Sequence, residues 1–334
     1  MQFTRNIIIF LIFLALSVNA SAQDDLRKRA NTIFGIMPSS MYGSKNDTID
    51  QIKLGERLYF ETALSINSKQ SCNSCHNILG GGAGVDNLKT SVGTLGAVGR
   101  RNTPSTWNAG FQLALNWDAS AKTLEEQAKR PLLNPLEMAL PSEKVAIKRL
   151  SKAGYKNAFR QAFPDTPKPL TFDNIARALA AFQRTLITDD RFNHFLAGDD
   201  DALNTQEKKG LKIVLQNGCS TCHTGPLMGG QFTMKMGLIN PYSNTQDKGL
   251  AETTGRSEHN FLFKVPMLRN VANTAPFFHD GGGADLDQAV FDTGWLQLGV
   301  KLSNQDVKDI SAFLRSLGNI KPYKSSLNQE NVNE

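Results

Sequence analysis

The sequence predicts a mainly α-helical protein made of two helical domains in series, with long loops and few strands. Apolar residues recur at helical spacing in several segments, whereas runs that alternate with a period of two are rare. Two motifs of identical pattern begin at Cys72 and Cys219, 147 residues apart, which suits two similar modules. A length of 334 residues is enough for two domains.

Residues 1–22 are predicted to be a signal peptide rather than part of the fold. Arg5 precedes an apolar run over residues 7–18, and the small residues at 20–22 form a cleavage site. The run is too short for a helix that spans a bilayer, although an uncleaved N-terminal anchor is the alternative. No later segment offers the roughly 20 apolar residues of a spanning helix. We therefore expect an exported, periplasmic chain that begins near Gln23.

Five segments after the signal peptide carry the apolar spacing of an amphipathic helix. They cover residues 48–60, 142–150, 172–186, 205–215 and 307–317. Ser142 is placed to cap the second helix, and Ser303 to Asp306 form a start signal for the last one.

The turns and the domain limits complete this outline. Glycine-rich turns are expected at residues 80–84 and 281–283, and the polar tail from Ser325 is expected to fray. We place the N-terminal domain at residues 23–195 and the C-terminal domain at residues 196–334.

The net charge of +6 at pH 7 is scattered along the chain. No basic run with interleaved aromatic residues is present, so nucleic acid is not an expected partner. The excess of positive charge at most favours electrostatic steering of an acidic partner.

All four cysteines occur in two motifs, Cys72-Asn-Ser-Cys75-His76 and Cys219-Ser-Thr-Cys222-His223. This is the attachment signature of a c-type haem, in which two thiols add to the porphyrin vinyl groups and the histidine becomes the proximal iron ligand. A zinc site would leave the two histidines without a common role, and a disulfide across two residues is typical of redox enzymes. We therefore predict two covalent haems, with His76 and His223 as ligands.

From about residue 54 to residue 317 the chain resembles the bacterial di-haem cytochrome c peroxidase family, which includes the MauG-like enzymes. The resemblance rests on Leu54-Gly-Glu-Arg-Leu-Tyr-Phe60, Arg101-Asn-Thr-Pro104, Trp117-Asp118, Thr185-Leu-Ile-Thr188, Val265-Pro-Met-Leu-Arg-Asn-Val271, Thr274-Ala-Pro-Phe-Phe-His-Asp-Gly281, Gln297-Leu-Gly299 and the segment around the first cysteine motif. It implies two cytochrome-c-like domains, a peroxidatic haem in the first, an electron-transfer haem in the second, and a calcium ion between them.

The resemblance also assigns roles to single residues. Trp117 occupies the family position between the haems, where it would relay electrons; a plain core aromatic is the alternative. Glu137 falls on the distal glutamate, with Gln127 as its supporting glutamine, and a carboxylate there can move a proton as the O–O bond of peroxide breaks. The calcium site carries over to Asn102 and the backbone carbonyls of Thr274 and Pro276, oxygen ligands that suit a hard cation.

Two positions depart from the family pattern. Thr94 replaces a distal histidine that many members carry on the first haem, so we expect that haem to be five-coordinate or to hold only water, without reductive activation. Thr293 replaces the methionine or tyrosine ligand of the second haem, so either water binds there, another side chain replaces the ligand, or the site is open. Loss of a methionine ligand predicts a lower reduction potential for this haem, less separated from that of the first haem, than in ordinary peroxidases of the family. Four methionines are candidate substitutes, although methionines near a haem more often serve packing: Met228, Met234, Met236 and Met267. His279 is expected near this haem as a non-ligand.

The resemblance implies reduction of hydrogen peroxide to water at the first haem. Electrons would arrive singly from a small cytochrome c or a cupredoxin through the second haem. A MauG-like oxidase that modifies a residue of a partner protein is the alternative enzyme, and a di-haem electron-transfer cytochrome is the alternative outside enzymes. The resemblance is also compatible with a homodimer.

Overall fold

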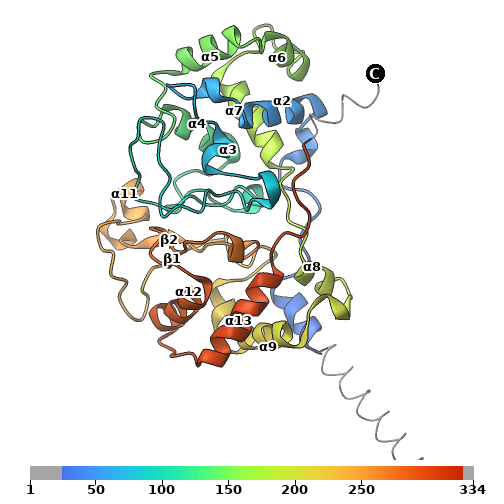
Figure 1. Cartoon of the computed structure of the whole chain (residues 1–334), viewed down its shortest axis with the longest axis vertical. Coiled ribbons are helices and arrows are strands. Elements are labelled where there is room, and N and C mark those ends of the chain that lie inside the picture. Colours follow the sequence, from blue (N-terminus) through green and yellow to red (C-terminus); the bar gives the residue numbers. More distant parts are fainter. Residues whose placement is uncertain (1–24, 326–334) are drawn as a thin grey trace, which may run out of the picture.

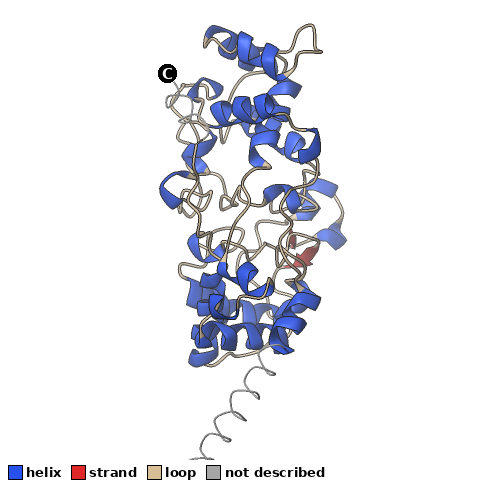
Figure 2. Ribbon diagram, turned by 90° about the vertical axis from the view of Figure 1, so that its right-hand side faces the viewer, coloured by secondary structure: helices blue, strands red, loops and turns tan. Residues whose placement is uncertain are grey.

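The computed structural model describes residues 25–325, so the predicted signal peptide lies outside the described residues. The chain forms two helical lobes joined by long loops, and one short two-stranded sheet lies near their junction (Figures 1 and 2). The prediction of a mainly helical fold with few strands is confirmed. Among the described residues, no helix is both long enough and apolar enough to cross a membrane.

The first lobe is built from six helices. They are α2 (Ile49–Tyr59), α3 (Cys72–Cys75), α4 (Leu124–Leu133), α5 (Glu143–Lys152), α6 (Lys156–Ala162) and α7 (Phe172–Gln183). Thr48 and Gln51 start α2 with a reciprocal capping box, in which each side chain accepts from the other residue's backbone N–H at 3.2 Å. The side chain of Ser142 caps α5 as predicted.

The second lobe contains helices α8 (Arg191–Leu196), α9 (Thr205–Gln216), α10 (Cys219–Cys222), α11 (Leu250–Thr254), α12 (Leu286–Thr293) and α13 (Asn304–Ser316). Strands β1 (Thr233–Lys235) and β2 (Leu262–Lys264) pair antiparallel, with Met234 opposite Phe263. A π-helical turn over Gly294–Leu298 directly follows α12. The last helix begins at Asn304, earlier than predicted, because Ser303 itself is the capping residue.

Both lobes contain a pair of helices that cross at a glycine. In the first lobe α2 meets α7, where a Cβ on Gly55 would lie 1.8 Å from the carbonyl oxygen of Ala178. In the second lobe α9 meets α13, where a Cβ on Gly210 would lie 1.9 Å from the carbonyl oxygen of Asp309. The two lobes therefore repeat one packing arrangement, as two similar modules should.

We expect Gly210→Ala to lower the free energy of unfolding by about 1–3 kcal/mol, because the added methyl group must push α9 away from the backbone of α13. Alanine is the better helix former by about 1 kcal/mol, but that gain cannot relieve a clash with a carbonyl. Gly99→Ala is the matched control, since no atom lies within 4 Å of its Cβ position. Chemical denaturation of both haem-loaded variants measures the difference, and equal stabilities would contradict the packing argument.

Each lobe has its own apolar core, but the ends of the described chain cross between them. The helical residues 25–33 contribute Ala30 to the second core, and Phe34 joins it there. Tyr323 returns to the first core, where its ring contacts Phe182 at a centroid distance of 5.9 Å. Phe192 and Phe195 of α8 also belong to the second core although they precede the predicted domain limit at 195/196, and Leu196 joins that core directly after the limit. That limit stays a prediction.

Candidate functional site

The first cysteine motif is folded as a single helical turn followed by its histidine. The hydroxyl of Ser74 accepts a hydrogen bond from the Ser71 N–H at 3.0 Å, and the backbone N–H of His76 donates to the Cys72 carbonyl at 2.9 Å. The second motif repeats this geometry, with the His223 N–H donating to the Cys219 carbonyl at 3.0 Å. None of the four cysteines takes part in a disulfide, and no metal-binding cluster of three or more His, Cys, Asp or Glu side chains occurs in residues 25–325.

Both motif histidines are held in the orientation that an iron ligand needs. The Nδ1 of His76 lies 3.1 Å from the Pro104 carbonyl oxygen, and the Nδ1 of His223 lies 2.9 Å from that of Met228. A carbonyl can only accept, so Nδ1 carries the proton and Nε2 keeps its lone pair. Burial lowers the pKa of both imidazoles, which favours the neutral form that binds metal. The residues present therefore fit a c-type haem at each motif.

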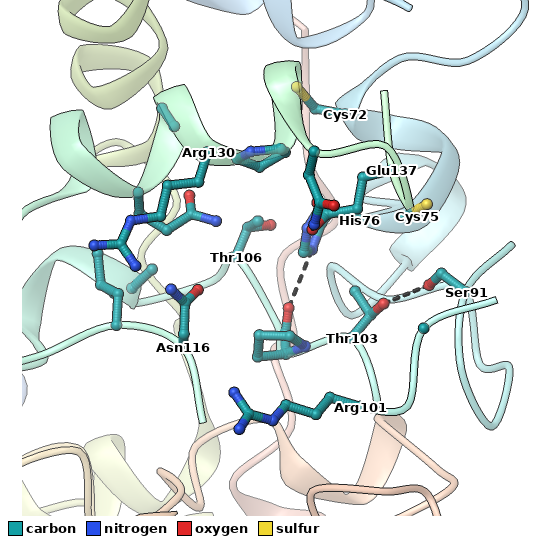
Figure 3. Close-up of a pocket in the computed structure, with 18 of the residues that line it drawn as sticks. Cys72, Cys75, His76, Ser91, Arg101, Thr103, Thr106, Asn116, Arg130 and Glu137 are labelled. Carbon is teal, nitrogen blue, oxygen red and sulfur yellow. Dashed lines mark hydrogen bonds between the residues drawn. The ribbon is translucent and has the colours of Figure 1, made fainter. Parts of the chain in front are cut away.

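A cavity of about 460 Å³ opens beside the first motif (Figure 3). Cys72, Cys75 and His76 line it, and so do Gln127 of α4 and Glu137 of the loop that follows α4. The structure thus gathers all five predicted residues around one space. Its volume and its composition suit a porphyrin with polar groups left over to contact a small substrate.

Glu137 is exposed to this cavity although it lies deep in the protein. Its Oε1 accepts a hydrogen bond from the Asn134 side-chain amide at 2.5 Å, and its backbone N–H donates to the Asn134 carbonyl at 3.0 Å. Burial raises the pKa of the Glu137 carboxyl, an effect that the Asn134 hydrogen bond partly opposes. A carboxylate with a raised pKa accepts a proton more readily than an ordinary glutamate, and it can then donate that proton again.

Thr94 does not point a ligand into the first cavity. Its hydroxyl donates to the Asn67 side-chain oxygen at 2.5 Å, and Asn67 returns a hydrogen bond to the Thr94 carbonyl at 2.6 Å. The Thr94 N–H donates to the Glu137 carbonyl at 2.8 Å, so this loop packs on the Glu137 loop. The neighbouring Gly93 lines the cavity, whereas Thr94 does not.

A second cavity of about 280 Å³ lies beside the second motif. Its lining includes Cys219, Cys222, His223, His279, Thr293 and three of the four candidate methionines, Met234, Met236 and Met267. Met228 is not among the lining residues; it is buried and supplies the carbonyl that holds His223. The hydroxyl of Thr293 donates to the Ala289 carbonyl at 2.7 Å, one helical turn earlier in α12.

The two cavities share one wall, and Trp117 is part of it. The indole N–H donates to the Asn102 carbonyl at 2.8 Å, and the ring meets His279 edge-on at a centroid distance of 6.5 Å. Sequence reasoning missed Lys264 and Gln112, which line both cavities as well. The sequence around Lys264 does not indicate that this residue is buried, because its burial depends on the tertiary contacts of β2.

The three residues predicted to bind calcium also come together at the edge of the second cavity, which Asn102, Thr274 and Pro276 all line. The Asn102 side-chain amide donates to the carbonyls of Leu88 and Lys89 at 3.1 and 3.2 Å. The calcium ion itself stays a prediction.

The repeated motif, the two cavities and the paired helical lobes together define a di-haem c-type cytochrome. Residues 49–201 match the family described as di-haem cytochrome c peroxidase, and residues 207–318 match cytochrome c. The chain is 40% identical over 318 residues to the cytochrome c551 peroxidase of Pseudomonas aeruginosa, covering 93% of this chain and 91% of that one. It therefore belongs to the di-haem cytochrome c peroxidase family, which includes the MauG-like proteins.

Three further comparisons support this family assignment. The cytochrome c551 peroxidase of Nitrosomonas europaea is 39% identical over 278 residues, which are 83% of this chain and 82% of that one. The methylamine utilization protein MauG of Methylorubrum extorquens is 30% identical over 284 residues, which are 81% of this chain and 78% of that one. A solved MauG-like protein associated with microbial copper homeostasis superposes with a TM-score of 0.78 at 28% identity, covering 87% of this chain and 96% of that one.

Proposed function

We propose that this protein is a peroxidase that reduces hydrogen peroxide to two water molecules, using two electrons and two protons. The observation that carries the proposal is the first cavity, where Glu137 and Gln127 share the space with a haem-attachment motif. Relatives at about 40% identity are named peroxidases, whereas the MauG proteins are more distant, which favours the same reaction here.

The haems, when bound, supply the redox chemistry and the reservoir of electrons. His76 and His223 would hold the irons through their free Nε2 atoms, which Nδ1 hydrogen bonds orient. The Glu137 carboxylate would take a proton from one oxygen of peroxide and return it to the other, which would leave as water when the O–O bond breaks. The two electrons supplied by the haems and two further protons would convert the remaining oxygen into the second water. Gln127 would orient the substrate, and Trp117 would carry electrons across the shared wall.

The remaining assignments belong to the same proposal. Electrons come singly from a small cytochrome c or a cupredoxin, in the periplasm. A calcium ion at Asn102, Thr274 and Pro276 would tie the loop before Trp117 to the second lobe, since Asn102 lines both cavities. A homodimer is the assembly that the family resemblance allows.

A MauG-like oxidase of a partner protein is the second candidate. One observation favours it: Thr293 replaces the methionine that the family pattern of the peroxidases would have there, and its hydroxyl donates to the Ala289 carbonyl. A simple electron carrier is disfavoured, because a carrier has no use for an acid such as Glu137 in an open cavity.

The deciding experiment mixes the ferric, fully haem-loaded protein with hydrogen peroxide and follows the Soret absorption. A peroxidase shows a rapid change and then oxidises added reduced cytochrome c over many turnovers. A rapid change without turnover favours the MauG-like candidate. A spectrum that peroxide leaves unchanged would refute both enzyme functions and leave the carrier.

The resting first haem is expected to be five-coordinate or water-bound, because Thr94 turns its hydroxyl to Asn67. The electron spin resonance spectrum of the oxidised protein should therefore contain a high-spin ferric signal before any reductant is added. A spectrum with only low-spin, bis-histidine haem would contradict this expectation.

A further inference from the structure

Lys264 is a buried cation in the wall between the two haem cavities. Only 6% of the residue is exposed, and it lines both cavities together with Gln112 and Trp117. Its backbone N–H donates to the Trp117 carbonyl at 2.8 Å, so β2 fixes the lysine beside the tryptophan.

Among residues 25–325, the ammonium group of Lys264 has no ion-pair partner. Its ammonium group donates to the side-chain oxygen of Gln112, which is neutral, and no carboxylate of the described residues lies within ion-pairing distance. Asp118 acts on it from further away, but Arg101 holds that carboxylate at 2.6 Å. Asp247 is likewise bound to Arg101, at 2.7 Å.

Arg269, a second buried cation, shows what Lys264 lacks. Arg269 is 1% exposed and pairs with Asp190 at 2.5 Å, whereas Lys264 makes one neutral hydrogen bond. Burial lowers the pKa of Lys264 to about 8, and the distant Asp118 only partly opposes this effect. An uncompensated buried charge is strongly destabilising, so a lysine at this place indicates an anion that the bound group supplies.

A c-type haem carries two carboxylate groups on its porphyrin edge. We propose that Lys264 is the shared counter-cation of these carboxylates, contacting those of both haems across the wall that it forms with Trp117 and Gln112. The inference rests on the two haem sites of the proposed function, and it does not depend on peroxide chemistry.

Such a cation changes the reduction potential of both irons in the same direction. Reduction removes one positive charge from a haem, and a fixed positive charge nearby favours that change. Lys264 therefore raises the reduction potential of both haems, and it also makes the carboxylate edges less repulsive to each other. The expected consequence of losing the charge is a lower midpoint potential at both sites.

The test is a spectroelectrochemical titration of the haem-loaded protein without peroxide. In Lys264→Met both midpoint potentials should fall, while Lys264→Arg should keep them close to those of the wild type. Lys235→Met on the paired strand is the matched control, because Lys235 is exposed and lines neither cavity. Unchanged potentials in Lys264→Met would overturn the proposal, and a fall at one haem only would overturn the sharing.

Gln112→Glu decides the question if Lys264→Met fails to take up both haems. It places an anion on the atom that already accepts from Lys264, and it should therefore lower both potentials. Potentials that stay unchanged in this variant would overturn the proposal. Both variants are assessed by reduction potential and not by turnover. Failure of the peroxidase function can therefore be distinguished from failure of this proposal.

Discussion

Glu137→Gln is expected to slow the reaction of the ferric protein with hydrogen peroxide by about 10²- to 10⁴-fold, the usual contribution of a positioned proton-transfer group. Glutamine keeps the shape and the Asn134 contact but cannot take a proton from the substrate. Stopped-flow absorption at increasing peroxide gives the second-order rate constant. Glu126→Gln is the control, because Glu126 lies on α4, pairs with Arg130 and does not line the cavity.

The same carboxyl group should set the acid limb of the pH profile. Burial raises the Glu137 pKa, so the proton stays on to a higher pH than on an ordinary glutamate. The reactive carboxylate is present above this raised pKa and is lost as the pH falls through it. The rate constant should thus decline at a higher pH than an exposed glutamate would give, and Glu137→Gln should flatten that limb. A wild-type profile without an acid limb, or a mutant as fast as the wild type, would remove Glu137 from the chemistry.

The helices that the sequence predicted are those with local signals. Thr48, Ser142 and Ser303 each cap a helix whose apolar residues face a core, so α2, α5 and α13 could be found without tertiary information. The helix α4, which carries Gln127, was missed; it contains Pro131 and has a charged first turn. The position of α4 depends on its packing against α7, and no local sequence pattern predicts this contact.

The haem-binding part of the site is likewise local, because one pentapeptide holds both thiols and the histidine. The surrounding wall is assembled from distant segments. Nothing near Lys264 in the sequence indicates that it is buried beside Trp117, nor that Thr94 turns towards Asn67. Sequence alone also left four methionines as candidates near the second haem, and only the fold removes Met228 from that set.

Thr293→Met is expected to raise the midpoint potential of the second haem, on the order of 100 mV or more, because a thioether ligand favours the reduced iron. The position lines the second cavity at the end of α12, so a longer side chain there enters the space beside His223. Thr293→Val is the matched control: it removes the hydroxyl bond to Ala289 and supplies no ligand, and its potential should stay near that of the wild type. Potentiometric titration followed by the absorption of each haem measures all three proteins.

The native methionines of the second cavity offer an alternative ligand, and the same titration distinguishes this alternative. Met236 accepts a weak hydrogen bond from the Gln297 amide at 3.5 Å, and Met234 and Met267 line the same space. If one of their sulfurs already binds the iron, the wild type will have a high potential and Thr293→Met will add nothing. Leucine at the ligating position would then lower the potential, whereas leucine at the other two would not. A wild-type potential that is low, and that only Thr293→Met raises, would show that no methionine binds the second iron in this protein. The protein would then also lack part of the driving force for electron transfer from a donor to this haem.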